Sequence, residues 1–309
     1  MYNVTTTFIL LGIVEMERFR YLFCALSLII YFATLKFNIV ITLVVFLDKS
    51  LHEPMYILIA SLMVNGIFGS SFFLKLNRLV FSSKVITRLG CFIQSFCIMS
   101  FSYSEITMFS IMAYDTFLAV CHPLHYHSLI TSRKLPILIC GSLLLNVTLV
   151  SSALILSAIL PLCGTYIYTV YCDNTAIFIL SCVDVSVNKM YGNFNFIGYL
   201  TLNISIIVYC YMRIFLICLK VSKDAFKRSI HTLVTHFLNL SVFLMGIVFM
   251  FVRSRLGDIN LHLGFHIIFS ISSLVFPPLL NPLIYGIRTK ALKVKVSHQL
   301  QNIKKFTPF

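Results

Sequence analysis

Seven long apolar stretches constrain the fold of this chain more than any other feature of its sequence. They lie at about 22–47, 55–79, 90–121, 134–160, 190–218, 229–252 and 263–286, and each is long enough to cross about 30 Å of hydrocarbon as a helix. Only 11% of the residues are charged, whereas about 25% is usual in soluble domains. The sequence therefore predicts an all-α membrane protein built as a seven-transmembrane helix bundle.

The last segment, 287–309, differs from the seven stretches because lysines alternate with apolar residues. Its apolar residues are Ile287, Ala291, Leu292, Val296 and Leu300. This spacing predicts a short amphipathic C-terminal helix that lies on an anionic membrane surface. We therefore divide the chain into an N-terminal segment (1–21), a seven-transmembrane domain (22–286), and an amphipathic helix with its tail (287–309).

Charge and a glycosylation pattern indicate the orientation in the membrane. The net charge is +14, but the basic residues form short clusters between apolar stretches. This pattern fits contact with lipid headgroups and not with nucleic acid. More Lys and Arg residues lie on the side of the C-terminal tail, which predicts that this side is cytoplasmic. Asn3 begins an Asn-Val-Thr sequon. We expect a multi-pass plasma-membrane protein with an extracellular, glycosylated N-terminus.

Four of the ten cysteines lie on the predicted outer side of the membrane. They are Cys91, Cys163, Cys172 and Cys182. An oxidising compartment favours two disulfides, for which four cysteines allow three pairings. A zinc site is the alternative, but the wide spacing and the lack of a second ligand pair disfavour it.

One face of the third stretch carries an acidic residue deep in the predicted membrane. Residues Ile98, Ser102, Glu105, Phe109, Met112 and Thr116 recur at steps of three and four, so they share one helix face. A carboxylate at this depth favours the interior of a bundle over lipid. We therefore expect Glu105 to lie inside the bundle. Whether it reaches Lys36, an unexpected base in the first stretch, is open.

The seventh stretch contains the sequence PPLLNPLIYGIR, in which Asn281-Pro282 precedes Tyr285 by about one turn. Proline leaves a backbone carbonyl without its helical donor and permits a kink. The Asn281 side chain is a candidate donor to that freed carbonyl. The alternative is a kinked helix that has no switching role.

Several short motifs occur in one order along nearly the full chain. They are Leu51-His52, Pro54-Met55-Tyr56, Cys91, Gln94, Met112-Ala113-Tyr114-Asp115, Cys121, Pro123-Leu124, Tyr126, Cys172-Asp173, Cys182, Asp184, Thr232, His236, Phe249-Met250, Pro278, Asn281-Pro282, Tyr285-Gly286 and Arg288. The chain in these respects resembles an odorant receptor of the rhodopsin-like G-protein-coupled receptor family. Its outer loops are more similar to the aquatic-type (class I) branch.

This resemblance implies disulfides Cys91–Cys172 and Cys163–Cys182, and an odorant cavity among stretches three, five, six and seven. The implied ligand-binding residues are Ile98, Met99, Ser102, Tyr103, Arg255 and His266. Arg255 lies where one branch of the family binds carboxylate odorants, and a guanidinium could pair with such an anion. The alternative is that Arg255 extends to the membrane interface beside Arg253.

The resemblance also implies a switch region that faces a heterotrimeric G protein of the stimulatory or olfactory type. Its residues are Asp115, Thr116, Tyr211, His236, Asn281, Pro282 and Tyr285. Several family residues differ on this inward half of the chain. Among them, Thr116 replaces the arginine after Asp115, Phe117 replaces a tyrosine, and Gly66 replaces an aspartate. Asp115 could accept hydrogen bonds from Thr116 or from the inner loop. An odorant-receptor-like protein that couples poorly or not at all is therefore the alternative function.

Other classes of function fit the sequence less well. Transporters usually contain internal repeats or broken helix pairs, and this chain shows neither. His262 and His266 have a spacing that can bind metal, but no Glu follows the first His as in zinc proteases. We therefore expect a receptor and not an enzyme, with no cofactor and no bound metal.

Overall fold

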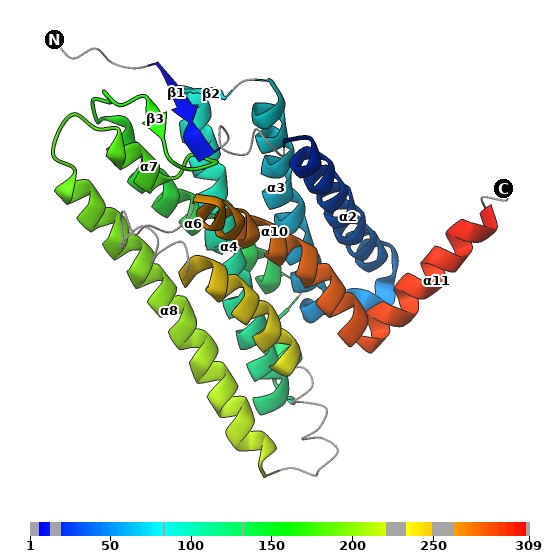
Figure 1. Cartoon of the computed structure of the whole chain (residues 1–309). Coiled ribbons are helices and arrows are strands. Elements are labelled where there is room, and N and C mark those ends of the chain that lie inside the picture. Colours follow the sequence, from blue (N-terminus) through cyan, green and yellow to red (C-terminus); the bar gives the residue numbers. More distant parts are fainter. Residues whose placement is uncertain are drawn as a thin grey trace.

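The computed structural model describes residues 6–12, 20–82, 84–131, 133–220, 233–248 and 263–306 of the 309-residue chain. Six long helices and one shorter apolar helix form a bundle (Figure 1). They are α2 (Arg20–Leu47), α3 (Pro54–Ser82), α4 (Arg88–Cys121), α6 (Lys134–Ala158), α8 (Ser186–Cys218), the helix Leu233–Val248 and α10 (Leu263–Arg288). Each matches one of the predicted apolar stretches, and the described helix ends differ from those predicted by a few residues. The predicted seven-helix fold is thereby confirmed.

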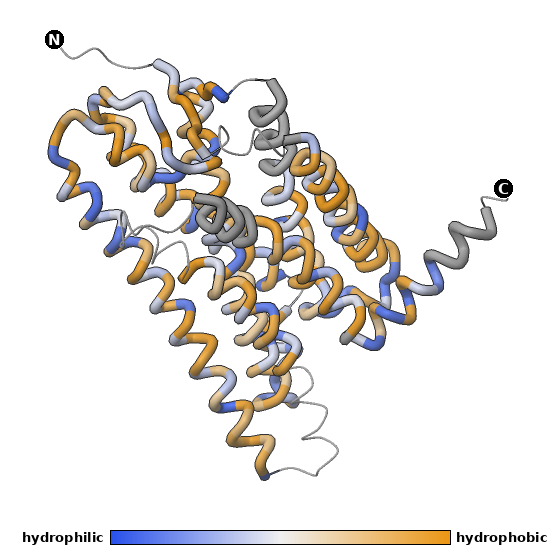
Figure 2. Tube along the Cα trace, in the orientation of Figure 1, coloured by the Kyte–Doolittle hydropathy of each residue, from blue (hydrophilic) through white to orange (hydrophobic). Residues whose placement is uncertain are grey.

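Helix α4 lies at the centre of the described bundle and is buried along most of its length. It packs against α3, α6 and α8, so a side chain on almost any of its faces meets another helix. By contrast, α2, α6 and α8 carry many large apolar side chains on exposed faces, and Figure 2 shows apolar residues along the length of α8. Apolar surface of this extent fits a bundle surrounded by lipid.

A small sheet closes one end of the bundle, which we call the disulfide end. Strand β1 (Thr7–Leu10) pairs antiparallel with β2 (Val85–Thr87) and parallel with β3 (Tyr166–Ile167). The short helix α7 (Asn174–Ile179) lies in the same long loop as β3. Its N-cap is Asp173, whose carboxylate accepts a hydrogen bond from the Ala176 amide at 2.7 Å. The sequence analysis did not predict this sheet.

The opposite end, which we call the tail end, carries the 3-10 helix η2 (Lys49–Leu51) and the helices α5 (Tyr126–Leu129) and α11 (Lys290–Phe306). Leu292 of α11 is fully buried against the main apolar core. Ile287 is different from the prediction, because it belongs to α10 and is exposed. Helix α10 continues to Arg288, and the amphipathic helix α11 begins at Lys290.

An ion pair connects α11 to the end of α2. Lys295 donates to the Asp48 carboxylate at 2.6 Å, and Asp48 also accepts hydrogen bonds from the amide and hydroxyl of Ser50. These contacts lower the pKa of Asp48 to about 2, and the hydrogen bond from Lys295 makes the largest contribution. The pair therefore helps to hold α11 above about pH 4, the ordinary pKa of aspartate, and is lost as the pH falls towards 2.

We expect Asp48→Asn to loosen α11 at neutral pH, because the ion pair with Lys295 is removed. The measurement is hydrogen–deuterium exchange across α11 in detergent at pH 7, where deuterium uptake should rise. Lys293→Met is the control, because the exposed Lys293 side chain lies on the same helix. Equal uptake in Asp48→Asn and the native chain would show that Leu292 packing alone holds α11.

Candidate functional site

A buried polar cluster joins α3, α4 and α10 near the middle of the bundle. Glu105 on α4 has no exposed surface. One of its carboxylate oxygens accepts a hydrogen bond from Asn65 of α3 at 2.7 Å, and the other accepts one from Asn281 of α10. Lys36 is not a partner in this cluster, because its side chain is exposed on α2. Two amides therefore hold the carboxylate that the sequence predicted inside the bundle.

The carbonyl that proline leaves free in α10 has a different donor from the one predicted. Pro282 cannot donate to the carbonyl of Pro278 four residues earlier. Asn38 of α2 donates its side-chain amide to this carbonyl at 2.8 Å, and Asn281 donates to Glu105 instead. The prediction that Asn281 satisfies the freed carbonyl is therefore wrong. Asn38 can reach it because α10 packs against α2.

Gly66 leaves the space in which Asn38 makes this contact. A Cβ atom at position 66 would lie 2.9 Å from the Asn38 side-chain oxygen and 3.5 Å from the Pro278 Cα. The first distance is shorter than real Cβ contacts allow. The family-typical carboxylate is thus absent from position 66, and a carboxylate is present instead on the neighbouring helix at Glu105, where it contacts Asn65.

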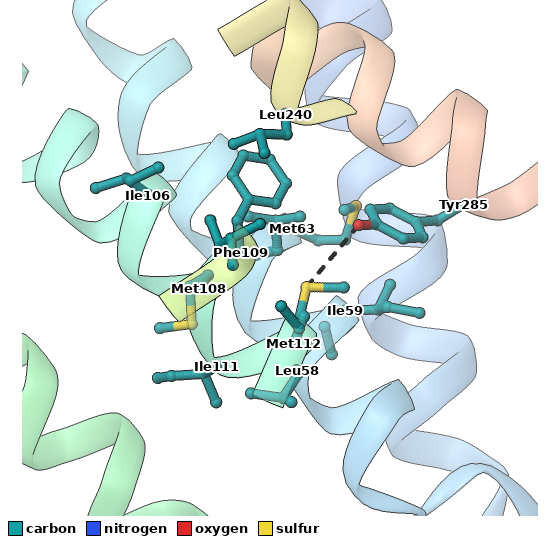
Figure 3. Close-up of a cluster of buried hydrophobic side chains, with 14 of the residues drawn as sticks. Leu58, Ile59, Met63, Ile106, Met108, Phe109, Ile111, Met112, Leu240 and Tyr285 are labelled. Atoms are coloured by element: carbon teal, nitrogen blue, oxygen red, sulfur yellow. Dashed lines mark hydrogen bonds between the residues drawn. The ribbon is translucent and has the colours of Figure 1, made fainter. Parts of the chain in front are cut away.

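A second contact group lies towards the tail end and joins three helices. The Tyr285 hydroxyl of α10 lies 3.0 Å from Nδ1 of His236 in the helix Leu233–Val248. It also donates to the Met112 sulfur of α4 at 3.9 Å. Figure 3 shows Tyr285 and Met112 among buried apolar side chains that include Met63 and Leu240. A shift of the helix Leu233–Val248 or of α10 would therefore change a contact made by α4.

Asp115 and Thr116 lie where α4 approaches the tail end, and both are buried. Asp115 accepts a hydrogen bond from the hydroxyl of Tyr126 in α5 at 2.9 Å. Thr116 does not donate to Asp115. Its hydroxyl donates to the Met112 carbonyl on its own helix at 2.8 Å. Of the two donors considered for Asp115, Thr116 and the inner loop, the inner loop therefore supplies the hydrogen bond, through Tyr126.

We expect Tyr126→Phe to destabilise the native chain by about 1–3 kcal/mol, since hydrogen bonds to charged groups contribute in this range. Burial and then the nearby Asp115 charge raise the pKa of Tyr126, so its hydroxyl remains a donor at neutral and mildly alkaline pH. The measurement is thermal unfolding in detergent, with deuterium uptake of α5 as the local readout. Tyr209→Phe is a control on exposed α8 surface; equal effects of the two variants would contradict a specific Asp115–Tyr126 contact.

The residues predicted to bind ligand on α4 lie towards the disulfide end. Tyr103 is buried, its hydroxyl is 3.4 Å from the Asn195 side-chain oxygen, and its ring stacks on Tyr199 of α8 with centroids 4.7 Å apart. Ile98 is also buried, whereas Met99 and Ser102 are half-buried. The Ser102 hydroxyl donates to the Ile98 carbonyl.

Other predicted residues have little or no structural description. Arg255 and the glycosylation candidate Asn3 lie outside the described residues, as do His262 and the side chain of His266. Tyr211 is half-buried on α8 against the main core. The three sequons within the membrane-spanning stretches begin at Asn146, Asn203 and Asn239, and all three asparagines are buried.

The sequence analysis missed a polar network beside Tyr103. Thr107 of α4, Asn146 of α6 and Tyr199 of α8 form hydrogen bonds with one another. Thr107 also donates to the Tyr103 carbonyl at 2.7 Å. The network therefore holds Tyr199, the stacking partner of Tyr103, in place. Periodicity could have placed Thr107 on an inward face, but not the partners from two other helices.

Both disulfides join the long loop after α6. Cys91 at the start of α4 is bonded to Cys172, and Cys163 is bonded to Cys182. This is the pairing that the resemblance implies. The first bond fixes the loop to the end of α4, next to Gln94, whose side chain accepts a hydrogen bond from the Cys172 amide at 2.9 Å. Among the described residues, no group of three His, Cys, Asp or Glu side chains could hold a metal.

Apolar helices around a buried α4, polar contacts between α3, α4 and α10, and a disulfide-linked loop define a multi-pass helical membrane protein. A model of the olfactory receptor family matches residues 23–303. The chain belongs to the olfactory receptor family, whose members are receptors and not enzymes.

Individual olfactory receptors are similar in sequence to this chain along nearly their full length. Olfactory receptor 6N1 of Homo sapiens is 31% identical over 308 residues, which cover 98% of this chain and 97% of the relative. Olfactory receptor 52J3 of Homo sapiens is 31% identical over 294 residues, or 94% of each chain. Olfactory receptor 6E1 of Mus musculus is 29% identical over 320 residues, with 99% of each chain covered.

Proposed function

We propose that this protein binds a small odorant in a cavity at its disulfide end and signals to a stimulatory heterotrimeric G protein at its tail end. The observation that carries this proposal is the contact of Tyr285 with both His236 and Met112. Through it, one side chain of α10 links the helix Leu233–Val248 to α4. A ligand that binds better to one arrangement of these helices shifts the population towards that arrangement.

The proposed orientation places the disulfide end outside the cell. Disulfides persist in an oxidising compartment, which supports an extracellular segment 1–21, with Asn3 as its glycosylation site, and a plasma-membrane location. Residues 22–286 then form the membrane domain. The lysine-rich segment 287–309 faces the cytoplasm, where anionic lipid attracts basic residues.

The proposed odorant cavity lies between α4, α8, α10 and the sixth span. Ile98, Met99, Ser102 and Tyr103 are its proposed wall on α4, and Arg255 and His266 are the other proposed ligand-binding residues. Support comes from the ring stacking of Tyr103 with Tyr199, which gives the α4–α8 boundary an apolar surface with a few polar atoms. Sites of this composition suit small neutral or singly charged ligands.

The alternative is a receptor that binds odorant but couples poorly. Thr116 has no charge with which to pair Asp115, and its hydroxyl is committed to the Met112 carbonyl. Tyr126 supplies a neutral hydrogen bond to Asp115 instead. We favour coupling, because Asn281 contacts Glu105 and Tyr285 contacts both His236 and Met112, so α10 is linked to α4 and to the helix Leu233–Val248.

A cyclic-AMP assay in expressing cells tests the proposal, with a panel of acids, amines and alcohols. Surface labelling of each variant provides the expression control. The native chain should respond to at least one compound. A response of Thr116→Arg to a compound that leaves the equally expressed native chain silent would exclude coupling and favour the alternative.

We propose carboxylic acids as the ligand class, with Arg255 pairing with the carboxylate. We expect Arg255→Ala to weaken the response to acids by about tenfold or more, because a charge-assisted hydrogen bond is lost. Responses to alcohols should change less. Arg253→Ala is the matched control, and equal effects of the two variants on acids would contradict a specific role for Arg255.

A further inference from the structure

An apolar groove on the outside of the bundle is separate from the proposed odorant cavity. Its volume is about 810 Å³, which is within the usual range for small-molecule sites. α4 forms its floor, α3 and α6 form its walls, and Val45 and Phe46 of α2 lie at its tail end. Asn65 of α3, Ser100 of α4 and Leu143 of α6 line its middle, and His52 lines its tail end.

One buried polar group in this groove has no partner among the described residues. The Ser100 hydroxyl makes no hydrogen bond to any of them, and the residue is 8% exposed. Serines and threonines in helices commonly donate to the carbonyl four residues earlier. On the same helix Ser102, Thr107, Ser110 and Thr116 all do so. Ser100 differs from these four residues because its hydroxyl remains available in the floor of the groove.

The position of Ser100 puts this hydroxyl near the middle of the membrane. Asn65 of α3 donates to the carbonyl of Phe101 at 3.3 Å, so Ser100 and Asn65 lie at about the same depth. Asn65 is about 16 Å along α3 from Pro54 at the usual helical rise, roughly half of a 30 Å hydrocarbon core. An acyl chain that filled the groove at this depth would leave the hydroxyl unsatisfied.

We propose that this groove binds a small neutral lipophile with a single oxygen, an aliphatic alcohol dissolved in the bilayer, whose hydroxyl pairs with Ser100. The residues that line the groove include no Lys, Arg, Asp or Glu, and the one histidine, His52, is exposed at the tail end with a ring nitrogen 3.3 Å from the Phe46 carbonyl. Next to Ser100, an anionic or cationic ligand would therefore gain no opposite charge. A membrane sterol, which also carries a single hydroxyl, is the competing occupant, and the labelling experiment below distinguishes the two. The alcohol reaches the groove laterally, through the surrounding lipid.

Photolabelling of the full chain in lipid nanodiscs tests this site without any signalling readout. The probe is a ten-carbon primary alcohol that carries an aliphatic diazirine, and labelled peptides are mapped by mass spectrometry. We expect saturable labelling of peptides from α3, α4 and α6. Ser100→Ala should reduce that labelling about twofold to tenfold, the range expected for one hydrogen bond. Ser205→Ala is the control, because the Ser205 hydroxyl is exposed on α8 and bonded to the Thr201 carbonyl.

A second pair of variants tests the groove by its shape. Leu143 lines the groove, whereas the adjacent Leu144 does not and is 69% exposed. Leu143→Trp should abolish saturable labelling, and Leu144→Trp should leave it unchanged. Unsaturable labelling, or labelling that neither Ser100→Ala nor Leu143→Trp reduces, would overturn the proposal. So would saturable labelling by a sterol diazirine probe with none by the alcohol. Because G-protein signalling is not measured, failure of the odorant-receptor proposal leaves this result unaffected.

Discussion

Glu105→Ala should lower the stability of the native chain by about 2–4 kcal/mol, one of the two largest effects expected of a single substitution here. The carboxylate is fully buried and accepts hydrogen bonds from Asn65 and Asn281. Without it, the Asn281 amide loses its acceptor, and a buried unpaired amide costs about 1–3 kcal/mol. Asn65 retains only its longer contact with the Phe101 carbonyl at 3.3 Å, and the small alanine side chain adds a cavity.

Thermal unfolding in detergent measures this effect, with the midpoint lower by several degrees in Glu105→Ala. Glu105→Gln should fall between Glu105→Ala and the native chain. The glutamine oxygen can accept from one of the two amides, but its NH₂ group would face the other donor. An unchanged midpoint in Glu105→Ala would contradict the polar cluster as a link between α3, α4 and α10.

Gly66→Asp, which introduces the family-typical residue, should destabilise this chain by more than about 3 kcal/mol. The Cβ atom alone would approach the Asn38 side-chain oxygen to 2.9 Å. The new carboxylate would also lie next to the helix contact made by Glu105, and two buried carboxylates without a cation are costly. Displacement of Asn38 would leave the Pro278 carbonyl without its donor.

Two further variants separate the steric and the electrostatic parts of this effect. Gly66→Ala adds only the Cβ atom with its close approach to the Asn38 side-chain oxygen, so it should destabilise the chain less than Gly66→Asp, which also adds a carboxylate. Gly66→Asp combined with Glu105→Gln restores a single carboxylate and should recover part of the lost stability. If Gly66→Asp were as stable as the native chain, this result would contradict the close packing of α2, α3 and α10 around position 66.

Much of the fold could be predicted from sequence because hydrocarbon imposes a length and an apolar composition on each span. The seven spans, the inward position of Glu105 and the class of receptor all follow from patterns along one chain. The small sheet at the disulfide end could not be predicted in this way. Its three strands are short, and each is defined by pairing with a distant segment, as Thr7–Leu10 is with Val85–Thr87.

The hydrogen-bond partners of the buried polar groups could not be predicted from the sequence either. Both Asn38 and Asn281 are potential donors for the freed carbonyl of α10, and only the packing of α2 against α10 selects Asn38. The same limit applies to Asp115, for which Thr116 and the inner loop were equal candidates until the fold brought Tyr126 within 2.9 Å. Periodicity identifies the face of a helix, whereas hydrogen-bond partners depend on the rotation and depth of a neighbouring helix.

Nucleotide exchange on a purified heterotrimer is the most direct measurement of whether this olfactory receptor family member signals. The native chain in nanodiscs is mixed with a stimulatory G protein and a compound that gave a response in cells, or the full panel if none did. The account predicts that ligand accelerates GDP release by the native chain, with Asp115 held by Tyr126 and no arginine at position 116. Acceleration by Thr116→Arg together with none by the native chain would contradict it.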